Sequence, residues 1–379
     1  MGCVLGTAII ALTVAAAQPL PQVSVEAERR IGSGPKVPAH MRAPGFEGGI
    51  GIEVRGRWSR RFPKKSYAFE VRDASGDNRD VPLLGMPADD DWILYAAYND
   101  RTLIRNAVAY DTARWMGRYA ARTRFVELRV NGDYRGVYLL MERLKLHERR
   151  VGGDFLLELT SRRQVRRKGP SFRTPLTRRP IVWEDPERGE LSRRQAMRVR
   201  RQVARAERAL YRGGEGAWRR HVHAPSTIDF LLINELFKNE DGLHASTFMS
   251  TSPGRAIRLG PVWDFDVSTG QSTHGPSRFL RGWMLANRPW AERLYRDRTF
   301  AREMAGRWHR LRRAGLRTRL LHQVDLHAAR LSDAARRDSA RWPAGGDRPR
   351  GRRQAHVREL RRWLVRRIAW LDENLPRLG

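Results

Sequence analysis

The chain has almost no thiols. Cys3 is its one cysteine among 379 residues, and it lies in an apolar N-terminal segment. A mature chain that starts near Gln18 therefore contains no thiol, which excludes disulfides and cysteine catalysis. Long apolar runs are also missing after this segment, so no later part of the sequence predicts a membrane helix.

Lysine is scarce although the chain is strongly basic. The formal net charge is +32, yet only six of the 73 basic residues are lysines and the rest are arginines. Such a ratio is typical of codon bias in a GC-rich genome, so the charge alone does not indicate a nucleic-acid groove. The charge does favour acidic or phosphate-bearing ligands. The lysines are Lys36, Lys64, Lys65, Lys145, Lys168 and Lys238.

Residues 1–17 have features of a secretory signal. Val4 to Ala17 form an apolar run that ends in three alanines before Gln18, and its length suits a signal-peptide core rather than a membrane span. A basic residue before the run is missing, so a buried first helix and a misassigned start codon remain alternatives. We expect an exported protein, secreted or in the cell envelope.

The part from 18 to 160 is rich in predicted strands. Apolar residues alternate with polar ones in 50–55, 66–71 and 125–130, which is the period of a strand with one buried face. Asn131-Gly132 before the apolar stretch 134–141 predicts a tight hairpin. One helix is expected in this part, from Leu103 to Met116, with Gly117 ending it.

The sequence predicts that the chain after residue 190 is mainly helical. Residues 161–190 are expected to be a basic linker or loop, because 161–179 is rich in arginine and has no periodicity. A helix follows over 191–211, and another begins at Pro225-Ser226 with Ser226 as N-cap and ends at Gly242. The chain from Pro289 onward is helical, with a break at 343–351. Together, 18–160 and 191–379 predict an α+β fold.

Two aspartates flank a predicted hairpin inside the helical part. Strands 246–251 and 256–259 are joined by a turn with Pro253-Gly254, and Asp241 and Asp264 lie before and after them. Both ends of a hairpin lie close in space, so the segment 241–266 can bring the two carboxylates to one cleft. Phosphoryl transfer needs one carboxylate on a metal and another on the attacking hydroxyl. The same residues also fit a helix-ending turn and a solvated strand end.

Two of the six lysines stand beside a predicted strand. Lys64 and Lys65 precede the strand 66–71, and a compact ammonium in a chain that otherwise uses arginine suits phosphate binding. Glu142 follows the apolar stretch 134–141 and is a candidate partner for such a lysine. A solvated basic turn and a surface carboxylate beside Arg143 are the plainer alternatives.

Several ordered blocks resemble the CotH kinase family, whose members are secreted or spore-coat proteins similar to protein kinases. The resemblance implies a protein-kinase-like bilobal fold that uses ATP and magnesium to phosphorylate serines of an exported protein. The blocks are Arg55-Gly56 through Phe62-Pro63-Lys64-Lys65-Ser66-Tyr67, Leu83 to Trp92, Leu103-Ile104-Arg105-Asn106, Gly136 to Glu142, Asn234-Glu235-Leu236 with Lys238-Asn239 and Asp241, and Gly260 to Asp266.

The resemblance also assigns roles. It implies that Asp264 binds magnesium, and that Asp241 is catalytic, as base or as second metal ligand. Asp266 and Asn239 are further candidates for metal or phosphate contacts, because their oxygens suit magnesium. One of Lys64 and Lys65 would contact the nucleotide, with Glu142 nearby.

Three functions compete at this point. The first is an ATP- and magnesium-dependent kinase whose exported protein substrate is acidic or rich in serine. The second is a non-catalytic kinase-like scaffold of a coat or envelope. The third is a nucleic-acid-binding protein, for which the sequence has bulk charge but no ordered stacking aromatics.

Overall fold

The fold is that of a computed structural model, which describes residues 19–56, 59–165, 171–345, 348–349 and 353–378. The predicted signal segment 1–17 lies outside these residues. Within the described parts of the chain, no helix is both long enough and apolar enough to cross a membrane.

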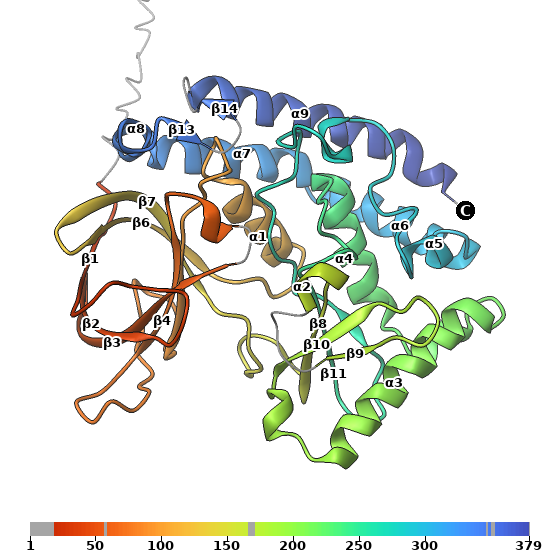
Figure 1. The fold of residues 1–379 in the computed structure, drawn as a ribbon. Helices are drawn as coiled ribbons and strands as arrows, with labels where there is room; N and C mark the ends of the chain where they lie inside the picture. Colours follow the sequence, from red (N-terminus) through yellow and green to blue (C-terminus); the bar gives the residue numbers. More distant parts are fainter. Residues whose placement is uncertain (1–18, 57–58, 166–170, 346–347, 350–352, 379) are drawn as a thin grey trace, which may run out of the picture.

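The N-terminal strands close into a barrel (Figure 1). Its strand order is β1-β2-β3-β4-β5-β7-β6, and a parallel pairing of β1 with β6 closes it. The predicted hairpin at Asn131-Gly132 is confirmed, since it joins β6 to β7. The barrel strands are β1 Gln22–Ala27, β2 Val37–Ala43, β3 Phe46–Arg55, β4 Ser66–Val71, β5 Asp91–Tyr95, β6 Thr123–Val130 and β7 Asp133–Glu142.

Alternation along the strands explains the two faces of the barrel wall. Ile52 and Phe69 are paired across β3 and β4 and point into the barrel, where both are fully buried. On β5, Leu94 packs inside the barrel, whereas its neighbour Ile93 packs outward into a second core. Because successive side chains of a strand face opposite sides, β5, β6 and β7 can contribute to both cores.

Helix α1 (Arg105–Trp115) lies in the connection from β5 to β6 and packs on this outer face. The predicted helix over 103–116 is confirmed to within two residues at each end. Gly117 follows it with φ +84°, a left-handed conformation that glycine adopts without a steric penalty.

A second, five-stranded sheet has the order β12-β11-β8-β10-β9. Two of its strands come from 161–190, so the expectation of a plain linker there is wrong. The apolar run Ile181-Val182-Trp183 pairs with β8 and is buried, which outweighs the arginines around it. The strands are β8 Phe155–Leu159, β9 Ser171–Arg173, β10 Pro180–Asp185, β11 Thr247–Thr251 and β12 Arg258–Leu259, and α2 (Arg162–Val165) precedes β9.

Helices α3 (Arg193–Arg212) and α4 (Ala224–Phe237) follow this sheet in the chain. Helix α3 confirms the predicted helix over 191–211, with Ser192 as N-cap. Ser226 is not the N-cap of α4: His223 is, and its Nδ1 accepts a hydrogen bond from the Ser226 amide. Pro225 fits in the first turn, where its missing N–H has no helical partner to lose.

The C-terminal helices run across both parts of the molecule (Figure 1). Two fully buried ion pairs hold them: Lys64 Nζ lies 2.6 Å from Asp338 of α8, and Arg367 of α9 lies 3.0 Å from Glu235 of α4. Helix α8 therefore docks on the barrel and α9 on the helical part. The helices are α5 Ala291–Leu294, α6 Arg298–Arg313, α7 Leu316–Arg330, α8 Ser332–Arg341 and α9 Arg353–Asn374, with short strands β13 Ala344–Gly345 and β14 Arg348–Pro349 in the predicted break.

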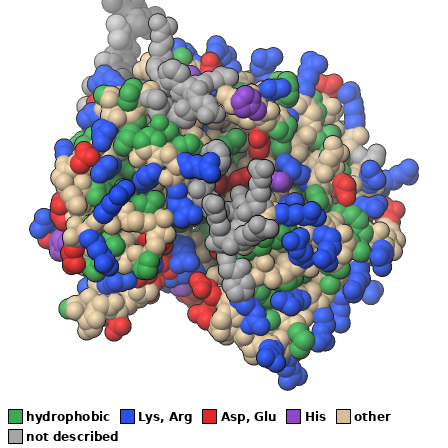
Figure 2. Space-filling model, in the orientation of Figure 1, with side chains coloured by type: hydrophobic (Ala, Val, Ile, Leu, Met, Phe, Trp, Pro, Cys, Tyr) green, Lys and Arg blue, Asp and Glu red, His purple; other side chains and the backbone are tan. Residues whose placement is uncertain are grey.

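Positive side chains cover much of the displayed surface, and they are dense where α3 lies in Figure 1 (Figure 2). Helix α3 has eight exposed arginines, and its one acidic residue, Glu207, is buried. This face therefore has no carboxylate of its own helix to offset its charge. The arginines are Arg193, Arg194, Arg198, Arg200, Arg201, Arg205, Arg208 and Arg212.

Candidate active site

A cleft of about 560 Å³ lies between the barrel and the part of the chain after it. The barrel side is lined by ends of β3, β4, β5 and β7, and the other side by Asp241 and the segment from Trp263 to Val267. The predicted hairpin is confirmed, since β11 pairs antiparallel with β12. It brings Asp241 and Asp264 to one cleft, with Asp266 beside them.

Helix α1 holds the segment that carries Asp264. The Phe265 amide donates to Asn106 Oδ1 at 2.6 Å, and the Asp264 amide donates to the Tyr110 hydroxyl oxygen at 3.3 Å. Asp264 itself has φ +61°, a left-handed conformation that costs free energy for a residue with a side chain and recurs at functional sites. The Arg105-Asn106 block of the sequence therefore positions the aspartate-bearing segment.

The three carboxylates repel one another. Burial, followed by the charges of Asp264 and Asp241, raises the pKa of Asp266 well above its ordinary value. No ion pair reaches Asp264 or Asp266 from any cation in the described part of the chain. Tyr95 lies close to both carboxylates. Burial and the charges of Asp266 and Asp264 raise the pKa of Tyr95, and the Asp266 carboxyl is near enough to act on its hydroxyl.

These features fit a divalent cation. A bound cation would offset the repulsion that raises the pKa of Asp266, and carboxylate oxygens are the ligands that magnesium prefers.

Asn239 positions the aspartates rather than lining the cleft. Its Oδ1 accepts a hydrogen bond from the Asp241 amide at 3.2 Å, and its Nδ2 donates to the Trp263 carbonyl at 3.3 Å. The side chain is buried, and it is not part of the cleft wall. Asn239 thus connects the segments of Asp241 and Asp264, whereas a metal contact by Asn239 stays a prediction.

Neither Lys64 nor Lys65 lines the cleft. Lys64 Nζ donates to Asp338 Oδ1 and to the Val137 carbonyl, both at 2.6 Å, and Lys65 Nζ donates to the Arg60 carbonyl at 2.6 Å. Nucleotide contact by either lysine has no support in this placement.

The expected pairing of Glu142 with one of these lysines is wrong. Glu142 is fully buried and instead accepts from Arg122 at 2.8 Å and from the Tyr119 hydroxyl at 3.0 Å. Arg150 Nε lies 3.4 Å from the same carboxylate. Glu142 therefore joins the end of β7 to the loop before β8.

Arg55 is a cation of the cleft that lies near Asp264. It lines the cleft at the end of β3, its guanidinium carbon lies 5.9 Å from the centre of the Trp263 ring, and it is close enough to Asp264 for that charge to act on its pKa. Burial lowers the pKa of Arg55, and the charge of Asp264 opposes this. Sequence reasoning noted Arg55-Gly56 as a block but gave it no role. The available signal was an arginine that ends a strand directly before glycine.

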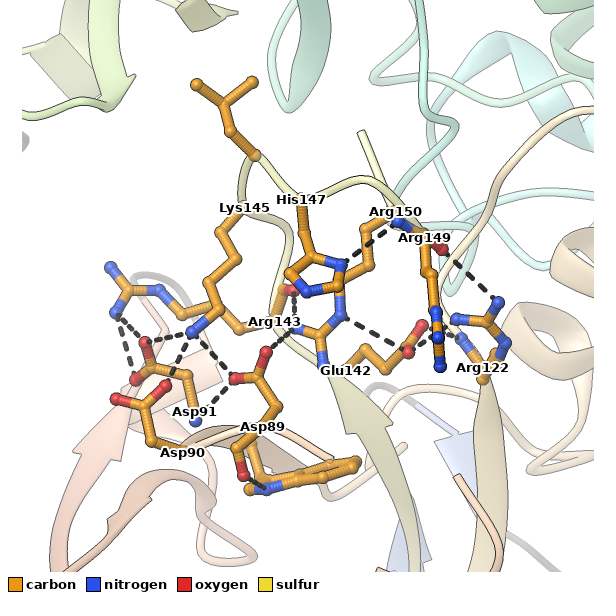
Figure 3. Close-up of polar contacts among 12 residues, drawn as sticks. Asp89, Asp90, Asp91, Arg122, Glu142, Arg143, Lys145, His147, Arg149 and Arg150 are labelled. Carbon is orange, nitrogen blue, oxygen red and sulfur yellow. Dashed lines mark hydrogen bonds and ion pairs between the residues drawn. The ribbon is translucent and has the colours of Figure 1, made fainter. Parts of the chain in front are cut away.

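A second acidic cluster lies at the start of β5 (Figure 3), and its carboxylates do not line the cleft. Asp89, Asp90 and Asp91 each contact a basic side chain: Lys145 Nζ lies 2.6 Å from Asp90 and 2.9 Å from Asp89, Arg150 lies 2.8 Å from Asp89, and Arg143 lies 3.2 Å from Asp91. Oxygens of Asp80, Asp89 and Asp90 also lie within 4.8 Å of one another. Lys145 and Arg150 already supply the positive charge that a metal would bring there.

The fold is α+β, and the carboxylates of Asp241, Asp264 and Asp266 line a cleft together with Arg55, between the barrel and the part of the chain after it. The chain belongs to the CotH kinase protein family, whose family model matches residues 52–371. That match covers most of the barrel, the whole cleft segment 241–266 and most of α9. The comparison with curated proteins found no match.

Proposed function

We propose that this protein is a phosphotransferase that moves the terminal phosphoryl group of ATP to a hydroxyl, most simply of serine, on an exported protein. The observation that carries the proposal is the convergence of Asp241, Asp264 and Asp266 in one cleft. Membership of the CotH kinase protein family supports kinase-like activity. In this proposal the barrel and the helical part act as the two lobes of a kinase-like enzyme.

Each cleft residue has a chemical role in the proposal. Asp264 and Asp266 would hold Mg²⁺, which supplies charge neutralisation for the phosphate oxygens. Asp241 orients the acceptor hydroxyl and takes its proton at a carboxylate oxygen. Arg55 binds phosphate oxygens through its guanidinium group, the role that a lysine was expected to have.

The substrate proposal rests on charge. The eight exposed arginines of α3 favour a protein segment that is acidic or already phosphorylated, because complementary charge speeds encounter and selects partners. Export itself is proposed from the sequence of residues 1–17.

The test measures transfer of labelled phosphate from ATP by the chain from Gln18 onward, with and without magnesium, onto itself and onto a serine-rich acceptor. Asp264→Asn and Asp241→Asn are each expected to lower the rate at least about 100-fold. Asp264→Asn removes a ligand of the cation that stabilises the phosphate charge, and Asp241→Asn removes the group that takes the proton. Asp90→Asn is the matched control, since it removes a carboxylate from the second acidic cluster, and it should keep the rate within a few fold.

Equal rates in the wild type and the two cleft variants would refute the proposal. A folded wild type without any turnover would instead favour the scaffold. Salt-sensitive DNA binding in the absence of turnover would favour a nucleic-acid-binding protein.

A further inference from the structure

A second pocket has a volume of about 810 Å³. Its walls come from the end of α1, the loop 150–153, the start of α4 and the β11–β12 hairpin, and it has no lining residue in common with the cleft. One segment of the chain contributes to both cavities: Gly260 to Val262 line this pocket, and the next residues, Trp263 and Asp264, line the cleft. Its volume is within the usual range for small-molecule sites.

The charged side chains that line this pocket are all basic. Arg118, Arg150, Arg255 and Arg258 line it together with His223, and no aspartate or glutamate does. Burial, followed by the charges of Arg258 and Arg118, lowers the pKa of His223. His223 therefore lies in a positive potential that an anion would relieve.

Two of these four arginines form ion pairs with aspartates that do not line the pocket, and the other two do not form an ion pair within the described residues. Arg118 lies 2.6 Å from Asp229, and Arg150 lies 2.8 Å from Asp89. Arg255 and Arg258 are exposed on the hairpin, and neither forms an ion pair within the described part of the chain. The hairpin arginines are therefore available to a ligand without breaking an existing contact.

Arg150 also carries an unused donor. Only 2% of its side chain is exposed, and its Nη2 is buried without a hydrogen-bond partner among the described residues. A buried donor without a partner costs free energy. Arg150 Nη2 is therefore a further donor beside the pocket that Arg150 lines.

Part of the wall is apolar, and the remainder includes glycines and the hydroxyl side chains of Tyr119, Ser226, Ser250, Thr251 and Ser252. Phe230, Ile233, Leu259 and Val262 line the pocket and are buried in the core. A ligand that is only a small anion would leave these surfaces in contact with water, whereas an apolar group would cover them.

We propose that this pocket binds a small amphiphilic anion, a molecule in which a phosphate or carboxylate group is attached to an apolar body. The anionic group lies between Arg255 and Arg258, where charge-assisted hydrogen bonds are strong and shaped for phosphate or carboxylate. The apolar body lies against Phe230 and Val262. The site is separate from the cleft, so it does not depend on the phosphotransferase proposal.

The experiment is a calorimetric titration of the whole chain with octyl phosphate below its micellar concentration. Octyl glucoside keeps the apolar part without the charge, and inorganic phosphate keeps the charge without the apolar part. Octyl phosphate should bind at least about tenfold more tightly than either, because each reproduces only one half of the recognition.

The double variant Arg255→Gln/Arg258→Gln should lose at least about tenfold in affinity for octyl phosphate. Arg313→Gln/Arg317→Gln removes the same charge from exposed positions on α6 and α7 and should bind like the wild type. Ala256→Trp, which fills the pocket from the hairpin side, should abolish binding while leaving the hairpin arginines in place.

Three results would overturn the proposal: octyl phosphate binding no tighter than octyl glucoside, equal affinities in the two double variants, or ligand protection from hydrogen exchange confined to residues outside 223–233 and 250–262. Vesicles that contain phosphatidic acid identify the source of the ligand. If the protein sediments with these vesicles and the double variant Arg255→Gln/Arg258→Gln does not, the ligand is a lipid. If the protein binds octyl phosphate but does not sediment with the vesicles, the ligand is a soluble molecule.

Discussion

The two acidic clusters of this protein differ in what surrounds them. Asp89, Asp90 and Asp91 each contact a lysine or an arginine within 3.2 Å, whereas Asp264 and Asp266 have no such ion pair from a cation in the described residues. In the paired cluster, Lys145 holds the pKa of Asp90 below its ordinary value, although burial raises the pKa of neighbouring Asp89. The pKa of Asp266 is raised well above its ordinary value.

This difference separates a structural cluster from a candidate site. Paired carboxylates connect β5 to the loop that follows β7, and they leave no charge for a ligand to neutralise. Crowded carboxylates repel one another and so favour a cation. The following predictions test that division, beginning with the largest expected effect.

Arg150→Met should destabilise the protein by about 3 kcal/mol, because buried Asp89 and Glu142 would lose a cation while Lys145 and Arg122 remain. Urea denaturation measures the loss. Arg149→Met is the control, since 69% of the Arg149 side chain is exposed, and it should change stability by less than about 0.5 kcal/mol. Equal losses in both variants would contradict a structural role for the cluster.

Magnesium should stabilise the wild type by about 2.7 kcal/mol at a concentration 100 times its Kd, because it binds the folded cleft and not the unfolded chain. Denaturation with magnesium or with EDTA gives the difference. Asp264→Asn should show little of it, and Asp90→Asn should show all of it. A magnesium effect that survives Asp264→Asn would place the cation elsewhere.

In EDTA, Asp266→Asn should raise the stability at pH 7 by about 1 kcal/mol. Because the pKa of Asp266 is raised in the folded protein, the native state keeps the proton longer, and stability falls as pH rises above the ordinary value of 3.8. The gain from the substitution should therefore appear only above that pH.

Asp90→Asn should behave with the opposite sign, because the folded-state pKa of Asp90 is lowered. Its contribution is present above pH 3.8 and is lost as pH falls through the folded-state pKa. Thermal unfolding between pH 3 and pH 8 compares the two variants. The same sign in both would mean that the clusters do not differ in charge balance.

Asp91→Asn should have the smallest effect, about 0.5 kcal/mol, because its partner Arg143 has 44% of its side chain exposed. The effect should disappear in 1 M salt, which screens exposed pairs. Denaturation at low and high salt checks it. A loss that persists in high salt would indicate that Asp91 contributes through a buried contact.

Local patterns were sufficient for much of the fold. Alternation predicted β3, β4 and β6. Asn131-Gly132 before an apolar stretch predicted the hairpin from β6 to β7, Gly117 marked the end of α1, and helical spacing predicted α3. These strands, turns and helices depend on residues that are close in the sequence, so they can be predicted from the local sequence pattern. The β10 strand was missed, because surrounding arginines hid a short apolar run that only pairing with β8 turns into a strand.

The candidate site divides in the same way. The order Asp241, hairpin, Asp264 was enough to predict a shared cleft, because a hairpin returns the chain to its starting point. Arg55 lines the cleft although sequence reasoning assigned it no role, and Lys64 does not line the cleft. The adjacent lysines, Lys64 and Lys65, look alike in sequence, yet Lys64 alone is buried against Asp338, 274 residues away.

The sequence by itself determined the α+β order of elements, the segment that carries the aspartates and the family resemblance, all of which rest on local periodicity and ordered motifs. Only the tertiary structure decided which charges are neutralised. Whether a carboxylate or a lysine is available to a ligand depends on partners brought from distant segments, as α8 brings Asp338 to Lys64 and the loop before β8 brings Arg150 to Asp89. Ion pairs act over a few ångströms of space and not along the chain, which is why residue type and spacing could not reveal them.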